Sequence, residues 1–364
     1  MGNVEPCFGS YLVQITNDRI GAGIMKKYAR LRAIEYYLPE EIVSNAALSS
    51  AFPDWMPEKI LEKTGIIERH IAGVHETASD LAYHAAEKLF LEHGVDKDDI
   101  DFLIFCTQTP DHLLPTSACL IHEKLGLKKH CGALDIGLGC SGYVYGLSLA
   151  KAMIESGISK NVLFLTGDTY SKYMHPKDRS VRTLFGDAAT ASLIVSSDEV
   201  ESKIGPFVFG TDGAGADNLI IPAGGSRLFP STETAIEYTD SMGNVRSQNH
   251  LYMNGPEIMS FTLSSVPTVF KEILLRAGKT IDEIDHVVFH QANKFMLEAL
   301  RKKIKIPHDK FIIELDTVGN TVSSTIPIAI ARAKQKGQIH CGDNVLILGF
   351  GVGYSWGAAI LESY

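Results

Sequence analysis

The second half of the chain repeats the order of the first half. The segment DEIDHVVFHQAN at 282–293 echoes DDIDFLIFCTQT at 98–109, and GNTVSSTIPIAIARAKQKG at 319–337 echoes GCSGYVYGLSLAKAMIESG at 139–157. A repeat of this kind indicates that one supersecondary unit has been used twice. Short buried strands alternate with helical patterns in each copy, which is typical of mixed, largely parallel sheets covered by helices. We therefore predict an α/β fold built from two duplicated halves that pack on each other.

The repeat also sets the expected domain organisation. Residues 26–200 form the first half and residues 201–364 the second half. Residues 1–25 are a weakly patterned N-terminal extension, and Met25 is a candidate start of the folded domain.

Composition excludes several classes of protein. Of the 364 residues, 45% are hydrophobic and 21% are charged, as in soluble globular chains, and a net charge of −9 argues against a general nucleic-acid binder. The six cysteines show no paired short spacing, so neither a zinc site nor a disulfide framework is indicated, and a reducing cytoplasm fits best. No stretch reaches the roughly 18 apolar residues of a membrane helix, and we find no secretory signal.

Cys140 is the first candidate for chemistry. It follows a short apolar run and two glycines, and it precedes about four turns of helical periodicity. A thiol that opens a helix feels the positive end of the helix dipole, which stabilises the thiolate and lowers the pKa. The backbone N–H of Cys140 could also face a developing oxyanion. The alternative is a small buried hydrophobic residue, which is the commonest fate of a free cysteine.

The repeat places two further polar residues at equivalent positions. His290 ends an apolar strand opposite Cys106, and Asn320 opens a helix opposite Cys140. Ligands of α/β folds bind at the carboxyl ends of strands, so Cys140, His290 and Asn320 are expected to converge near one axis. Taken singly, such a histidine is more often structural, and an asparagine after glycine is usually a helix cap.

From about Lys26 to Tyr364, the chain resembles a β-ketoacyl-acyl-carrier-protein synthase III of the thiolase superfamily. The matching motifs are KTGIIERHI at 63–71, ETASDLA at 76–82, GCSGYVYGL at 139–147, DR at 178–179 and LFGDAA at 184–189, PAGGSR at 222–227, HQAN at 290–293, GNTVSSTIP at 319–327 and GFGVGYSWGAA at 349–359. The resemblance implies a five-layer αβαβα fold, a homodimer, and neither a metal nor a redox cofactor.

The resemblance also implies the chemistry. Cys140, His290 and Asn320 match the catalytic triad of the family. Cys140 would take an acyl group from acyl-coenzyme A or acyl-carrier protein and hold it as a covalent intermediate. His290 and Asn320 would bind the malonyl thioester carbonyl as neutral donors and stabilise the enolate left after loss of carbon dioxide. The enolate would then attack the acyl-cysteine, so the resemblance implies an acyltransferase of fatty-acid biosynthesis. The backbone N–H groups of Cys140 and Val352 would form the oxyanion hole.

Several positions depart from the family pattern. Lys59 stands where many members have a tryptophan that stacks on the adenine of coenzyme A, so a stacking face is expected to be missing. Lys63 stands where an arginine is also common. Val352 replaces a glycine whose N–H normally completes the oxyanion hole. Phe295 replaces an arginine that often contacts the carrier protein, although a basic face for that partner could persist at Lys294, Arg301, Lys302 and Lys303.

The acyl pocket is expected to include Phe350 and Leu114, the latter at a position that the dimer partner often contributes. Leu114 permits a longer acyl chain, and the alternative is an ordinary interface leucine. Two other functions remain open. One is a thiolase-fold acyltransferase of a specialised or surface-polysaccharide pathway, with the same acyl-cysteine and a different acceptor. The other is a non-catalytic dimer partner, against which the complete set of Cys140, His290 and Asn320 speaks.

Overall fold

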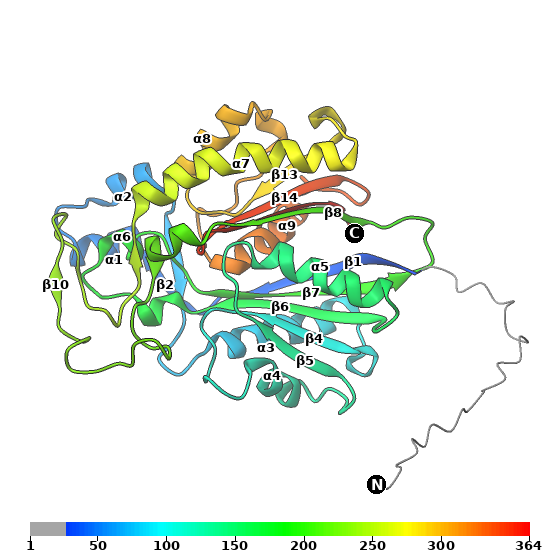
Figure 1. Ribbon diagram of the computed structural model, residues 1–364, viewed down its shortest axis with the longest axis horizontal. Coiled ribbons are helices and arrows are strands. Elements are labelled where there is room, and N and C mark those ends of the chain that lie inside the picture. The colour runs from blue at the N-terminus through cyan, green and yellow to red at the C-terminus, as the bar shows by residue number, and fades with distance from the viewer. Residues whose placement is uncertain (1–26) are drawn as a thin grey trace, which may run out of the picture.

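The computed structural model describes residues 27–364, which form two stacked sheets with helices outside and between them (Figure 1). The expected N-terminal extension at 1–25 and the candidate start at Met25 lie outside the described residues.

The first sheet has five strands in the order β1-β7-β6-β4-β5. The central strands β4, β5 and β6 are parallel, and β7 pairs antiparallel with both β6 and β1. The strand bounds are β1 Tyr28–Tyr37, β4 Phe102–Cys106, β5 Gly132–Ile136, β6 Asn161–Asp168 and β7 Ala188–Ser197.

The second sheet repeats this arrangement. Its order β8-β15-β14-β13 corresponds to β1-β7-β6-β4, with β13 and β14 parallel and the other pairs antiparallel. The counterpart of β5 is reduced to a single bridge between Val287 and Phe311. The strand bounds are β8 Ile204–Thr211, β13 His286–Phe289, β14 Asn344–Gly351 and β15 Ser355–Glu362. The duplication predicted from the sequence is thus confirmed strand by strand.

Six helices complete the five layers (Figure 1). Their apolar faces pack against the sheets and form three hydrophobic cores. Helices α3 and α4 cover the outer face of the first sheet, α5 and α9 lie between the sheets, and α7 and α8 cover the second sheet. Their bounds are α3 Ala78–His93, α4 Ser117–Leu125, α5 Gly142–Glu155, α7 Gly255–Ala277, α8 Lys294–Ile304 and α9 Thr325–Gln335. The five-layer αβαβα fold is confirmed.

Smaller elements gather at the carboxyl ends of the central strands. The hairpin of β2 and β3, helices α1, α2 and α6, and four short strand segments lie there (Figure 1). Their bounds are β2 Glu41–Ser44, α1 Asn45–Ala51, α2 Pro57–Thr64, β3 Glu68–Ile71, α6 Arg179–Arg182, β9 Leu219–Ile220, β10 Tyr238–Thr239, β11 Val245–Arg246 and β12 Tyr252–Met253. These elements wall the end of the molecule at which the sequence places the chemistry.

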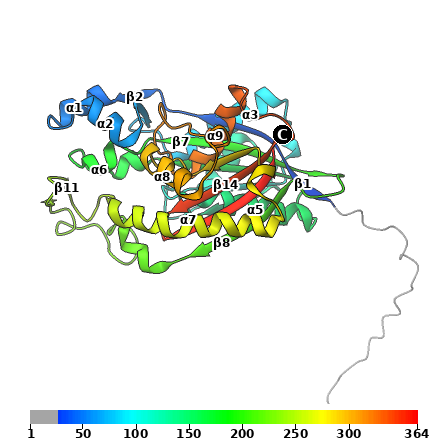
Figure 2. The same ribbon diagram turned by 90° about the horizontal axis from the view of Figure 1, so that it is seen from above.

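Helix α7 is the one described helix long and apolar enough to cross a membrane, judged by length and composition alone. Figure 2 shows it lying along the second sheet, and its side chains Phe261, Val266, Phe270 and Ile273 are buried there. In this fold the helix acts as a covering layer of the core.

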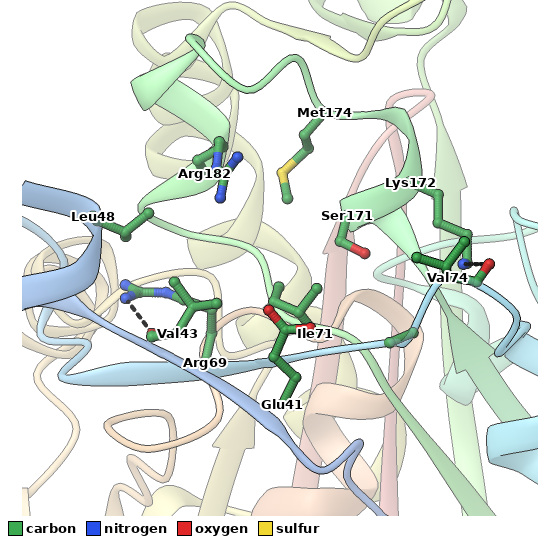
Figure 3. A pocket seen from close by; sticks show the side chains of 11 residues that line it. Glu41, Val43, Leu48, Arg69, Ile71, Val74, Ser171, Lys172, Met174 and Arg182 are labelled. Carbon is green, nitrogen blue, oxygen red and sulfur yellow. Dashed lines mark hydrogen bonds between the residues drawn. The ribbon is translucent and has the colours of Figure 1, made fainter. Parts of the chain in front are cut away.

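Arg69 of β3 is fully buried and ties the small elements together. Its guanidinium donates to the carbonyl of Val43 at 3.1 Å (Figure 3). It also donates to Oδ1 of Asn45 at 2.9 Å and to the carbonyl of Thr183 at 2.8 Å. Burial, followed by the nearby charge of Arg182, lowers the pKa of Arg69 to about 10. The planar fork of an arginine therefore joins β2, α1 and the segment after α6, which a lysine could not do.

We expect Arg69→Ala to destabilise the protein by about 3 kcal/mol or more, because each buried acceptor left without a donor costs about 1–3 kcal/mol. Arg30→Ala is a matched control, since Arg30 is exposed and, among residues 27–364, forms an ion pair with Glu199 at the surface, and it should cost about 1 kcal/mol or less. The measurement is the urea midpoint of each variant. Equal midpoints for the two variants would contradict the anchoring role.

Candidate active site

Cys140 lies in the turn between β5 and α5 and is 4% exposed. The first helical residue is Gly142 and the N-cap is Ser141. The prediction that Cys140 opens the helix is therefore wrong, because the cysteine lies just before the N-cap. Asn320 likewise precedes α9, from which a 3-10 turn at Val322–Ser324 separates it. Both residues sit in turns because neither helix begins until the chain has left the end of the sheet.

The second half approaches the cysteine through its backbone. A Cβ atom on Gly351 would lie 2.7 Å from the Cys140 sulfur, and one on Gly349 would lie 2.6 Å from the Cys140 carbonyl oxygen. Only glycine permits this contact between β14 and the cysteine turn. The backbone N–H of Val352, which follows directly, reaches the sulfur. The valine at this position therefore still presents its N–H to the nucleophile.

The thiol of Cys140 is protonated in the free protein, and the predicted lowering of its pKa is wrong. Burial raises the pKa to about 12, and the negative charge of buried Asp168 adds to the rise, while the N–H groups of Val352 and Cys140 partly oppose it. Loss of hydration is the larger effect because Cys140 and the first residues of α5 are all buried, so little water is left to solvate a thiolate.

His290 directly follows β13 and is 2% exposed. Its Nδ1 lies 2.7 Å from Oγ1 of Thr325, and its ring meets Phe350 edge-on with centroids 5.7 Å apart. Burial lowers the pKa of His290 to about 3, so the imidazole is neutral at physiological pH. A neutral imidazole can donate one hydrogen bond but carries no charge that would need a counter-ion.

Asn320 is fixed from both sides. Gly319 has a φ of +73°, and a Cβ there would lie 2.9 Å from the Leu184 carbonyl oxygen, so the chain turns tightly just before the asparagine. The Oδ1 of Asn320 accepts the backbone N–H of Val322 at 3.0 Å. Because the oxygen is held in this way, the amide NH₂ is the end left free to donate.

These three residues line one cavity of about 130 Å³. Its walls are otherwise mainly apolar and come from both halves: Leu184, Phe185, Leu219, Met253, Ile258, Met296 and Phe350. The cavity thus combines a sulfur nucleophile with two neutral donors in an apolar enclosure. Such a site can hold an acyl chain on sulfur and stabilise a negatively charged oxygen beside it.

A second, outer cavity of about 710 Å³ shares Met253 and Gly255 with the first. Trp55 lines this cavity. Two cationic side chains lie near its indole ring: Lys63 Nζ is 5.0 Å and Arg179 Cζ is 5.3 Å from the ring centroid. The conclusion that the stacking face is missing is therefore wrong. Lys59 is exposed, but Trp55 lies four residues earlier in the chain, in the loop before α2, and lines the cavity.

The sequence analysis did not consider Trp55 or Arg179 as contacts of the nucleotide, although the sequence offered a signal for each. Trp55 stands four residues before the position where an aromatic was sought, and Arg179 belongs to the quoted DR motif. A search for an aromatic residue within four positions of Lys59 would have found Trp55.

Among the residues predicted to bind substrate, Phe350 lines the inner cavity and Lys63 lines the outer one. The remaining residues predicted to contact the donor, the carrier protein or the dimer partner line neither cavity. Lys302 and Lys303 are exposed on α8, whereas Arg301 is engaged by Glu298 at 2.9 Å and by the Ile306 carbonyl. The stem of Lys294 packs against Gly65 at the end of α2. Leu114 is 83% exposed, away from the catalytic cavity of its own chain.

Figure 3 shows a further cavity of about 510 Å³ between the β2–β3 hairpin and α6. Arg69, Arg182 and Glu41 line it, and none of the three candidate catalytic residues does. Among residues 27–364, no group of three or more His, Cys, Asp or Glu side chains is arranged to hold a metal ion.

Comparisons with known proteins agree with this geometry. Two family models match: 3-oxoacyl-[acyl-carrier-protein (ACP)] synthase III over residues 134–213, and the C-terminal region of the same family over residues 274–363. A β-ketoacyl-[acyl-carrier-protein] synthase III from Caldanaerobacter subterraneus subsp. tengcongensis is 35% identical over 345 residues, which cover 95% of this chain and 98% of the relative.

Solved structures extend the match. A 3-oxoacyl-(acyl-carrier-protein) synthase III crystal structure has a TM-score of 0.91 at 53% identity and covers 92% of this chain and 99% of its own. The priming β-ketosynthase of the R1128 polyketide pathway has a TM-score of 0.81 at 28% identity, with coverages of 93% and 97%. The chain therefore belongs to the β-ketoacyl-[acyl-carrier-protein] synthase III family.

Proposed function

We propose that the protein is a condensing enzyme that joins an acyl thioester to malonyl-acyl-carrier protein, with loss of carbon dioxide, to give a 3-oxoacyl-acyl-carrier protein. The observation that supports this most is the single apolar cavity lined by Cys140, His290 and Asn320. An acyl group can wait there on sulfur while the two neutral donors act on the second substrate.

In the first half-reaction the sulfur of Cys140 attacks the carbonyl carbon of the acyl donor. The new S–C bond forms as the donor's S–C bond breaks, and the thiol proton leaves with the departing thiol. The carbonyl oxygen becomes negative on the way, and the N–H groups of Cys140 and Val352, which already act on the thiol, would stabilise it. The protonated resting thiol makes loss of the proton part of this step.

In the second half-reaction the malonyl thioester carbonyl accepts hydrogen bonds from His290 and Asn320. Carbon dioxide leaves, and the electron pair of the broken C–C bond becomes an enolate whose oxygen those donors stabilise. The enolate carbon attacks the acyl carbon, the Cys140 S–C bond breaks, and the thiolate recovers a proton from solvent. The low pKa of His290 suits this role, because the imidazole stays neutral beside the substrate.

Acyl-coenzyme A is the proposed donor, entering through the outer cavity with its adenine against Trp55 and Arg179. The exposed Lys59 lies beside the same cavity, and Lys63 lines it. The carrier protein would dock on the basic side chains of α2 and α8, which pack together: Lys59, Lys63, Lys294, Lys302 and Lys303. Acidic carrier surfaces suit such a face.

Three further expectations belong to this proposal. The protein acts as a homodimer in which the exposed Leu114 reaches the acyl pocket of the second copy. It needs no resident metal or redox cofactor. It works in the cytoplasm, in keeping with the free cysteines at 106, 119, 131, 140 and 341.

The half-reactions give the first test. Incubation with acyl-coenzyme A should add one acyl group to the intact mass, and Cys140→Ala should abolish the addition, whereas Cys119→Ala at an exposed cysteine should not. His290→Ala and Asn320→Ala should keep the acyl group but lose about 10²- to 10³-fold in condensation with malonyl-carrier protein, because each removes one donor to the enolate. Loading that survives Cys140→Ala would overturn the proposal.

The pH dependence of loading follows from the raised pKa of Cys140. Below a pKa of about 12 the thiolate fraction grows roughly tenfold per pH unit, so single-turnover loading should rise steeply from pH 6 to pH 8. Quenched samples can be followed by intact mass, with donor hydrolysis measured on Cys140→Ala. A rate that is flat over this range would mean that the thiol already ionises below pH 6, as a dominant helix dipole would require.

Trp55→Ala should raise the Michaelis constant for acyl-coenzyme A about five- to a hundred-fold, since stacking of a base on an aromatic side chain contributes roughly 1–3 kcal/mol. Loading from acyl-carrier protein should change little. Lys59→Ala removes a cation whose Nζ lies 5.3 Å from the centroid of the indole ring but keeps the ring itself, so it should have a smaller effect. If Lys59→Ala weakens coenzyme A donors as much as Trp55→Ala does, charge rather than stacking holds the nucleotide.

A further inference from the structure

The hydroxyl of Thr325 lies between the imidazole of His290 and a backbone carbonyl. Its Oγ1 is 2.7 Å from Nδ1 of His290 and 3.1 Å from the carbonyl oxygen of Val322. Thr325 and His290 are each 2% exposed. Water therefore has little access to this contact, and the hydroxyl is the partner that decides the state of Nδ1.

Only one proton is available to the hydroxyl, and it has two acceptors to choose between. If the proton goes to the Val322 carbonyl, Nδ1 must carry hydrogen and donate to Thr325, which leaves Nε2 with a bare lone pair. If the proton goes to Nδ1, then Nε2 carries the hydrogen. Because His290 is neutral, these two tautomers are the alternatives, and the threonine selects one of them.

The chemistry of the cavity distinguishes the two. Nδ1 is occupied by Thr325, so Nε2 is the nitrogen left to act on substrate. A bare Nε2 would set its lone pair against the negative enolate oxygen, whereas Nε2–H would donate to it.

We propose that Thr325 is a positioning residue whose hydroxyl donates to Nδ1 and thereby holds His290 as the Nε2–H tautomer that the enolate requires. The assignment rests on the proposed function, since the enolate belongs to it. Thr325 would have no direct contact with substrate and would act through the imidazole alone.

One turn of chain serves both donors. Val322 has a left-handed φ of 55°, which is uncommon for a β-branched residue, and its N–H donates to Oδ1 of Asn320. Its carbonyl faces Thr325, the first residue of α9. The turn from Asn320 to Thr325 thus orients the asparagine amide and places the hydroxyl that orients the histidine.

The kinetic test compares Thr325→Val, which keeps the shape and loses the hydroxyl, with Thr325→Ser, which keeps the hydroxyl. The valine variant should load acyl groups normally but release carbon dioxide from malonyl-carrier protein at least tenfold more slowly, and serine should restore the rate to within about threefold. Loss of a whole donor, at about 10²- to 10³-fold, is the upper bound. Equal decarboxylation by the valine variant and the parent would overturn the proposal.

Thr321→Val is the matched control. Thr321 lies in the same turn, and its hydroxyl is buried without a hydrogen-bond partner, so the same substitution should leave decarboxylation unchanged. If Thr321→Val slows the reaction as much as Thr325→Val, general disturbance of the turn explains both effects, and the tautomer assignment fails.

A spectroscopic measurement tests the tautomer without relying on activity or on a variant that must fold. In protein with ¹⁵N-labelled histidine, the resonances absent from His290→Ala identify the ring, and their pattern reports which nitrogen carries hydrogen. The proton should be on Nε2 in the parent protein, and Thr325→Val should shift it toward Nδ1. A proton on Nδ1 in the parent would overturn the proposal. An Nε2 proton in a protein that never decarboxylates malonyl-carrier protein would instead overturn the proposed function.

Discussion

The contact between the glycine-rich end of β14 and the turn that carries Cys140 is the constraint on which the site depends. Gly349 and Gly351 have no side chains, so the backbone of the second half touches the cysteine of the first half. This closeness lets the N–H of Val352 face the sulfur. A methyl group at Gly351 would lie 2.7 Å from the Cys140 sulfur, so the two backbones could not stay this close.

The same close packing sets the electrostatics of the cavity. Removing water from around Cys140 raises the pKa of its thiol, and removing water from around His290 lowers the pKa of its imidazole. Both groups are therefore neutral before substrate arrives. An uncharged site suits a reaction in which negative charge appears only transiently, because preorganised donors gain strength where competing water is excluded.

The fold and the three candidate catalytic residues could be predicted from the sequence, because the internal repeat relates positions that lie far apart in the chain. It predicted two duplicated α/β halves with largely parallel sheets and indicated that Cys140, His290 and Asn320 would converge. The state of the thiol could not be predicted, since burial of Cys140 arises from the packing of the other half against it. The roles of Trp55 and Thr325 were also hidden. Trp55 reaches its cavity from a shifted position, and Thr325 gains meaning only once His290 is seen beside it.

The central claim is that the two halves meet so that an acyl group on Cys140 is held by backbone donors within reach of His290 and Asn320. The most direct measurement is a crystal structure of the acylated enzyme, trapped as Asn320→Ala to prevent condensation. The account predicts an acyl group on the Cys140 sulfur, its carbonyl oxygen within hydrogen-bond distance of the N–H groups of Cys140 and Val352, and its chain against Phe350. An acyl group on another cysteine, or a carbonyl turned away from both N–H groups, would contradict it.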